Sequence, residues 1–375
     1  MYIMPVFKYY RPGVYLDKAV RYNELYFSEN HELNDPNDLV SFYEFEDDEY
    51  LWVQLFELPK ISENWDITKL FELNPKFISD INNFFKGRRF FSDFFSLQEF
   101  FKDINDDFDC FLTPYLIEGE DNNKDKMKIL SYKLSSFKSG FKELLARGVN
   151  NKFFSVSFSM DALNPMMWAH YAEGFKGCVL IYKAEGNIIH ISDNLYSNDY
   201  ISVEVLDVNY NNADKFLPLL KCACADDKNF IKENSLVKNK FWEYEKEKRA
   251  LMIAEFKTIF ISHCPKDKYN PYPRDMIYHH EPQELIGVIF GPKTALDKKN
   301  KIEYSIRHNK YYSKTGDFFV LETELTYSGD IIIKTGKKCV VVNPLNNTIG
   351  TMSEIFEGER LEKLKNYLGI TAFEN

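Results

Sequence analysis

Three glutamates on alternate residues are the strongest chemical feature of the chain. Glu243, Glu245 and Glu247 follow an aromatic pair and precede Arg249 and an apolar segment. If the stretch forms a strand, its period of two places all three carboxylates on one face, where like charges need a cation, a metal or a cationic transition state. If it forms a helix, Glu243 and Glu247 lie one turn apart on an ordinary charged surface.

Polar groups also stand on or beside predicted strands in three earlier segments. They are Lys8-Tyr-Tyr-Arg11, Asn34-Asp-Pro-Asn-Asp38, and Ser157-Phe-Ser159 followed by Trp168-Ala-His-Tyr171. Each also has a plain structural interpretation, as edge-strand cations, a turn, and solvent-facing serines beside a packing histidine. Their order along the chain, ahead of the glutamates, is what favours a shared site.

The elements that must position these residues predict an α+β fold. Short strands of aromatic and branched residues are expected near 6–10, 25–28, 153–159, 177–182 and 284–290. Residues from about 50 to 150 repeat apolar side chains at helical spacing, and we expect a helical insertion or lid there. The expected organisation is a core at 1–293, built of mixed, mostly antiparallel small sheets with this insertion, and a β-rich extension at 294–375 that ends in a helix.

Composition excludes several classes of protein. The chain has 375 residues and a net charge of −10, which argues against nonspecific coating of nucleic acid. It contains no run of about 18 apolar residues, so no membrane partner is predicted. The first residues do not resemble an export signal, and the six scattered cysteines favour reduced thiols in the cytoplasm.

The ordered segments resemble the domain-of-unknown-function 2971 family of bacterial and phage-associated proteins. The matching blocks include Phe7-Lys-Tyr-Tyr-Arg11, Leu33-Asn-Asp-Pro36, Val156-Ser-Phe-Ser159, Met167-Trp-Ala-His-Tyr171 and Tyr244-Glu-Lys-Glu-Lys-Arg249. They span residues from about 6 to 293 and leave the helical region and the C-terminal tail outside. This resemblance implies a family but no activity.

The same order also resembles, more loosely, the mono-ADP-ribosyltransferases. Those enzymes carry an early Arg or His, a middle Ser-x-Ser and a late Glu, and the resemblance implies an ADP-ribosyltransferase-like core that uses NAD. Here Lys8 replaces the early Arg or His, and Phe158 replaces the usual Thr. The catalytic residues that it implies are Glu247, then Glu245, with Ser157. The residues that it implies for cofactor binding are Lys8, Tyr9, Arg11, Asn34, Asp35, Ser159, Trp168 and His170.

Three functions remain open on the sequence. The leading one is an NAD-dependent ADP-ribosyltransferase-like effector in antiphage defence or a toxin system. Its acceptor would be an unidentified macromolecule or small molecule. A regulatory protein partner is compatible with this function, and no metal is expected. The second is a metal-dependent nuclease or phosphohydrolase, with Asp35, Asp38, Glu245 and Glu247 as Mg²⁺ ligands. The third is a non-catalytic module that senses a ligand or binds a partner.

Overall fold

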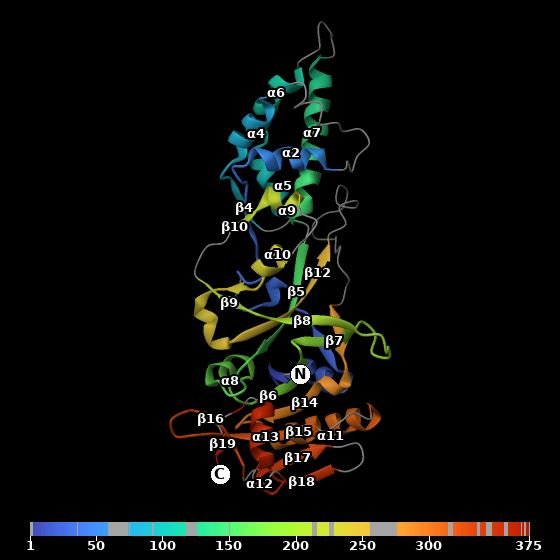
Figure 1. The fold of residues 1–375 in the computed structure, drawn as a ribbon, viewed down its shortest axis with the longest axis vertical. Coiled ribbons are helices and arrows are strands. Elements are labelled where there is room, and N and C mark those ends of the chain that lie inside the picture. The colour runs from blue at the N-terminus through green and yellow to red at the C-terminus, as the bar shows by residue number, and fades with distance from the viewer. Residues whose placement is uncertain are drawn as a thin grey trace.

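The protein has an elongated shape in which three regions follow one another along the long axis (Figure 1). A helical region stands at one end, a β-barrel lies at the centre, and a C-terminal sheet with its helices lies at the other end. The computed structural model describes residues 3–35, 37–58, 74, 76–91, 94–117, 126–149, 151–211, 216–224, 229–255, 276–313, 318–335, 338–342, 347–355, 359–368, 370 and 373–374.

Six antiparallel strands close into the central barrel, in the order β1-β5-β12-β8-β7-β6 and back to β1. They are β1 (Ile3–Tyr10), β5 (Asn151–Ser159), β6 (Cys178–Glu185), β7 (Ile188–Ser192), β8 (Ile201–Asp207) and β12 (Glu247–Glu255). Alternate residues point inward, as the period of a strand requires. Val6, Val156, Leu180 and Ala250 are therefore buried together in one apolar core.

Further strands extend this barrel into one continuous sheet. β13 (Ile277–His280) and β2 (Glu24–Tyr26) follow β7, and β14 (Leu285–Phe290) pairs with β6. β14 in turn pairs in parallel with β15 (Phe318–Leu325), which leads to β17 (Lys338–Val342) and β18 (Asn347–Thr351). The expectation of mixed α and β structure with antiparallel pairing is confirmed, but most strands join one sheet and not several small ones.

The C-terminal sheet is completed by short strands and helices. β15 also pairs with β16 (Ile331–Lys334), which pairs with β19 (Phe373–Glu374). The helices of this end are α11 (Leu296–Ser313), α12 (Met352–Ile355) and α13 (Glu359–Leu368), and α11 packs against α1 (Val14–Tyr22). The expected final helix is thus two helices followed by a strand.

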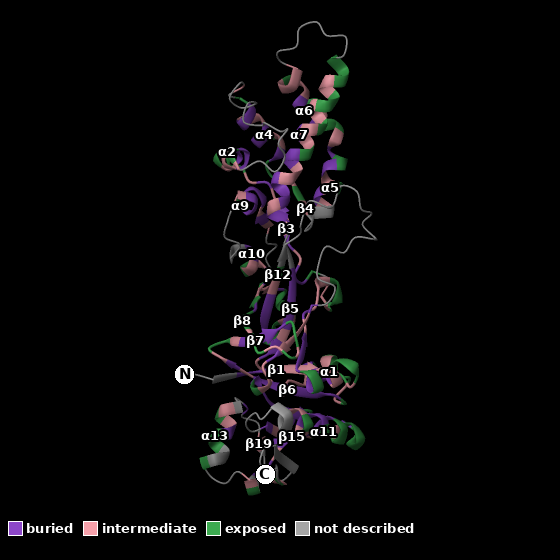
Figure 2. Cartoon of the chain, turned by 90° about the vertical axis from the view of Figure 1, so that its right-hand side faces the viewer, coloured by how far each residue is buried: buried purple, intermediate pink, exposed green. Residues whose placement is uncertain are grey.

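The helical region surrounds a core of aromatic side chains. Its helices are α2 (Glu49–Glu57), α4 (Phe77–Phe85), α5 (Phe94–Asp103), α6 (Asn105–Ile117), α7 (Lys126–Val149) and α9 (Leu219–Cys224), beside the small sheet of β10 (Phe216–Pro218), β3 (Phe42–Glu44) and β4 (Arg89–Phe91). In α7, Phe137, Phe141, Leu144 and Leu145 recur at helical spacing and are buried. α7 ends at Val149 and β5 begins at Asn151, so the helical region adjoins the barrel strand in sequence, and Figure 2 shows it beyond the end of the barrel.

The short elements near the middle of the chain complete the surroundings of the site. They are the 3₁₀ helices η1 (Asn30–Glu32) and η2 (Lys240–Glu245), the helices α8 (Pro165–Tyr171) and α10 (Asn229–Asn234), and the paired strands β9 (Asn209–Tyr210) and β11 (Val237–Lys238). A last 3₁₀ helix, η4 (Pro282–Glu284), connects β13 to β14.

Candidate functional site

The barrel opens where β1 and β5 separate. The two strands pair at Phe7 and Ser159. Beyond this rung Lys8 does not continue the ladder; its Nζ donates to the carbonyl oxygen of Ser157 at 3.2 Å. The chain after β2 reaches the same edge of β5 further along, through a bridge between Ser28 and Ser155. The gap between the strands is therefore lined with polar groups.

This opening is a cavity of about 390 Å³, within the size range of small-molecule sites. Segments far apart in sequence meet around it, including β1, the loop after η1, β5, α8, β11 and the junction of η2 with β12. Eight of the residues that the sequence singled out for catalysis or cofactor binding line it: Lys8, Tyr9, Arg11, Asn34, Ser157, Ser159, Glu245 and Glu247.

A buried network of ion pairs forms one wall of the cavity. Lys238 Nζ lies 2.6 Å from Glu245 Oε2, 2.9 Å from Glu247 Oε2 and 3.4 Å from Asp38 Oδ2. The guanidinium of Arg249 donates to both oxygens of Asp38, each at 2.6 Å, and to both oxygens of Glu247, at 2.7 and 3.0 Å. Two cations thus face three carboxylates, which leaves one excess negative charge.

Hydroxyl groups hold the two glutamates in place. The Tyr171 hydroxyl donates to Glu245 Oε1 at 2.5 Å, and the Ser159 hydroxyl donates to the Glu245 carbonyl at 2.7 Å. The backbone N–H of Glu247 donates to the Tyr210 hydroxyl at 2.7 Å. These contacts come from three separate elements, and they fix the backbone of both residues and the carboxylate of Glu245 before any ligand enters.

The two glutamates differ in their affinity for a proton. Burial by itself would raise the pKa of Glu247, but Arg249 and Lys238, with a hydrogen bond from Ser157, lower that pKa to about 2. Burial raises the pKa of Glu245 despite its contact with Lys238. Glu247 is therefore the permanent anion of the site, and Glu245 is the carboxyl that takes up a proton more readily.

Lys8 is an unusual cation that also lines the cavity. Burial lowers the pKa of its ammonium to about 8, an effect that the charge of Glu247 offsets only in part. A lysine in this range exchanges its proton near neutral pH and binds anions while it is charged. The cavity is therefore lined by a titratable amine as well as by the ion-pair network.

The glutamate segment is neither of the two structures that its pattern suggested. Glu243 and Glu245 lie on η2, and β12 begins only at Glu247. Lys246, with a φ of 44°, makes the turn between them. Glu243 is exposed, whereas Glu245 and Glu247 are buried. The prediction that all three carboxylates share one face is therefore wrong, and two of them share the cavity.

Three expected cofactor contacts do not line the cavity. The Asp35 carboxylate accepts from the Asn37 backbone N–H, and the residue lines a neighbouring hollow. Trp168 is fully buried; its indole N–H donates to the Ala162 carbonyl, and its ring packs edge-on against Tyr9. His170 is exposed, and its Nδ1 lies 3.1 Å from the Tyr244 hydroxyl. These side chains support the site without facing into it. Pro36, the middle of the expected turn, lies outside the described residues.

Lys238 and Tyr171 line the cavity and contact the glutamates, and neither of them had a role predicted from the sequence. Lys238, which contacts both glutamates, lies on the two-residue strand β11 and belongs to no recognisable sequence motif. Tyr171 lies within the Trp168-Ala-His-Tyr171 block, and its position at the last turn of α8 was the available signal. Tyr171 is the last residue of α8 and follows the buried Trp168 by three positions, so its hydroxyl can face a cavity at the end of the helix.

The contacts of the carboxylates bear on the metal-dependent alternative. Asp38, Glu245 and Glu247 all hold Lys238 or Arg249 in the structure. A magnesium ion there would have to displace a guanidinium or an ammonium from a buried site, and oxygen-rich magnesium sites present open carboxylates instead. The geometry of this cavity does not favour a nuclease.

Part of the site is similar to a known family. The family model described as "Protein of unknown function (DUF2971)" matches residues 167–250, which carry Tyr171, Lys238, Glu245, Glu247 and Arg249. This match supports the first resemblance found in the sequence. The searches of curated proteins and of solved structures gave no match. The looser resemblance to mono-ADP-ribosyltransferases, and the core that it implies, stay predictions. Within the described residues, no helix has the length and apolar character to cross a membrane.

Proposed function

We propose that the protein is an enzyme that cleaves NAD at the nicotinamide–ribose bond and transfers ADP-ribose to an acceptor. The observation that carries this proposal is the meeting of Lys8, Ser157, Glu245 and Glu247 around one cavity. These are the early cation, the middle serine and the late glutamates of the transferase pattern. A shared cavity is what the reaction needs from residues so far apart in the chain.

The cavity has the size for the reacting half of NAD. About 390 Å³ suits a nicotinamide and its ribose, and Arg11, which is exposed at the mouth, is positioned to bind the pyrophosphate that remains outside. The Tyr9 and Tyr10 side chains supply aromatic surface for the nicotinamide ring. Asn34 and the Lys8 ammonium offer donors to the ribose hydroxyls.

The excess negative charge of the network suits the bond that breaks. When the bond from the ribose anomeric carbon to nicotinamide breaks, its electron pair leaves with nicotinamide, and positive charge develops on the ribose. Glu247, which stays ionised, stabilises that charge across the cavity. Glu245 accepts a hydrogen bond from a ribose hydroxyl. The acceptor then bonds to the anomeric carbon and loses its proton to a base or to water.

Release of nicotinamide from NAD tests the proposal. Purified protein is incubated with NAD alone and with bacterial lysate, and nicotinamide is measured by chromatography. We expect Glu247→Gln and Glu245→Gln to lower the rate by 100-fold or more, and Glu243→Gln to retain it, because Glu243 is exposed on the same segment. No nicotinamide release and no labelled acceptor with the wild-type protein would contradict the enzyme proposal.

A binding measurement separates loss of chemistry from loss of the fold. Glu247 is buried in an ion network, so its variant is also expected to be less stable. Ser157→Ala and Tyr171→Phe remove single hydroxyls and keep every charge. If these variants bind NAD but release nicotinamide more slowly, the site is catalytic. Binding of NAD without turnover by the wild-type protein would indicate the sensor function instead.

A further inference from the structure

A second group of ionisable side chains lies between β7 and the turn that precedes β14. His190 is in the middle of β7, and β13 runs antiparallel beside it, with His280 opposite Ile191. After β13 the chain turns at Glu281 into η4, which ends at Glu284. The backbone N–H of Glu281 donates to the His190 carbonyl at 3.0 Å, which fixes the turn against the strand.

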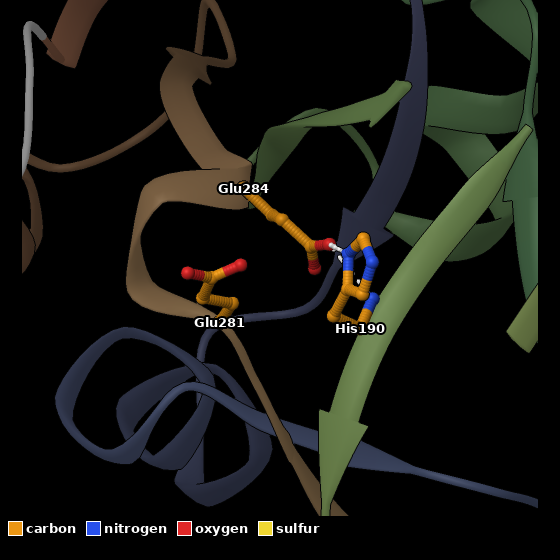
Figure 3. Close-up of side chains that lie close together, drawn as sticks. All are labelled: His190, Glu281 and Glu284. Atoms are coloured by element: carbon orange, nitrogen blue, oxygen red, sulfur yellow. Dashed lines mark hydrogen bonds and ion pairs between the residues drawn. The ribbon is translucent and has the colours of Figure 1, made fainter. Parts of the chain in front are cut away.

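The three side chains of this group converge. One ligand atom from each of His190, Glu281 and Glu284 lies within 4.8 Å of the other two. Glu284 Oε1 accepts from the His190 backbone N–H at 2.7 Å and lies 2.8 Å from His190 Nδ1. Figure 3 shows both glutamates reaching from one turn, with the Glu284 carboxylate between Glu281 and the imidazole.

The second oxygen of Glu284 lacks a partner. Glu284 is 5% exposed, and its Oε2 is buried with no hydrogen-bond partner among the described residues. Burying a carboxylate oxygen without a partner is costly, and such atoms are rare in folded proteins. Burial raises the pKa of Glu284 and the charge of Lys183 lowers it, but the Lys183 ammonium forms a separate ion pair with Glu185 at 3.0 Å. The turn therefore brings two carboxylates and an imidazole together, with one carboxylate oxygen left without a partner.

We propose that His190, Glu281 and Glu284 bind a zinc ion. An imidazole nitrogen with two carboxylates is a donor set that suits zinc, whereas magnesium and calcium prefer oxygen donors alone and in larger number. Around tetrahedral zinc the ligand atoms stand about 3.3 Å apart. The His190 side chain is 40% exposed and Glu281 is half-buried, so both can close on the ion.

The ion fastens β7 of the barrel to the turn from which β14 leads into the C-terminal sheet. Its three protein ligands leave a fourth position for water. None of them lines the cavity at β1 and β5, so the zinc site does not depend on the proposed reaction with NAD. The sequence pointed to none of these three ligands, because 94 positions separate His190 from Glu284 and no spacing motif joins them.

Titration with zinc chloride tests the site. Protein treated with a chelator and then dialysed is titrated by calorimetry, and its thermal midpoint is recorded with zinc, magnesium or calcium. We expect one zinc equivalent at micromolar or lower Kd, and a rise of the midpoint that grows with zinc concentration, as binding to the folded state requires. Magnesium and calcium are expected to give no rise.

Single-ligand variants locate the ion. Glu281→Gln and His190→Gln change partly exposed side chains, and each is expected to weaken zinc binding at least tenfold. His279→Gln is the matched control, because His279 lies on β13 with its ring nitrogen on the Tyr22 carbonyl. The proposal is overturned if the wild-type protein binds no zinc, or if Glu281→Gln and His190→Gln bind it as tightly as wild type.

Discussion

Lys238→Met tests whether the buried ammonium holds the candidate site together. Its Nζ lies within 3.4 Å of Glu245, Glu247 and Asp38, and methionine preserves most of the side-chain length. Without this ammonium the three carboxylates face Arg249 alone, and the excess negative charge rises from one to two. The variant is therefore expected to fold less stably and to hold the glutamates less firmly.

The size of the effect follows from burial. Removing one partner of a buried ion pair costs about 3–5 kcal/mol. With an unfolding entropy of about 2.1 cal/mol/K per residue, the 375 residues give about 0.8 kcal/mol/K, so a single unfolding transition falls by about 4–6 °C. Glu245 has a raised pKa in the folded state, and loss of Lys238 raises it further. A proton on Glu245 then offsets part of the cost, so the fall is larger at pH 8 than at pH 5.

Thermal unfolding at both pH values measures this effect, with two comparison variants. Lys240→Met changes an exposed lysine two positions after Lys238. An exposed ion pair contributes about 1 kcal/mol or less to the free energy of unfolding, so this variant is the control for loss of a lysine charge. Lys238→Met combined with Glu245→Gln returns the network to one excess negative charge, and we expect it to be more stable than the sum of the two single changes. A Lys238→Met midpoint within about 1 °C of wild type at pH 8 would refute the reasoning.

Further predictions concern the charges of the site and the helical region. Because the folded pKa of Glu247 is about 2 and its ordinary value is 4.5, Glu247 contributes stability above pH 4.5 that is lost as pH falls toward 2. Chemical denaturation should show a flatter acid limb for Glu247→Gln, and equal limbs would contradict the assignment. Reductively ¹³C-methylated protein should show a lysine signal that titrates near pH 8 and disappears in Lys8→Met; a spectrum in which Lys8→Met removes no such signal would be the contrary result. Phe85→Ala removes a fully buried ring and should destabilise the helical region by about 3–5 kcal/mol. Hydrogen exchange should then increase in α4 and α7 but not in the barrel, and unchanged exchange in α7 would count against this core.

Local patterns in the sequence account for much of the fold. The helical spacing of apolar residues from about 50 to 150 predicts helices with a buried face, and α7 has one, with Phe137, Phe141 and Leu144 buried. The alternation in 153–159 predicts a strand with serines on one face, and β5 has Val156 and Phe158 in the barrel core. These features depend on side chains within one or two turns or rungs, so their period is visible in a single chain.

The glutamate segment shows where such patterns fail. Alternation from Glu243 to Glu247 suggested one strand, but Lys246 adopts a left-handed conformation that ends η2 before β12 begins. Local caps of η2 by Asn239 and Lys246 are only part of the cause. Asn164 Nδ2 donates to the Tyr244 carbonyl, and Ser159 donates to the Glu245 carbonyl, so contacts about 80 residues away set the path of the backbone.

The residue types of the site were visible in the sequence, because lysine, serine and glutamate in that order already limit the chemistry. Their use was not. Arg249 meets Asp38 across 211 positions, and Lys238 joins two glutamates from a strand that no pattern marks. A buried charge is tolerated only beside its partner, and which partners meet depends on how β1, β5 and β12 close around the barrel. The sequence thus determined which groups are available for chemistry, and the tertiary fold selected the pairs, the burial and hence the pKa of each.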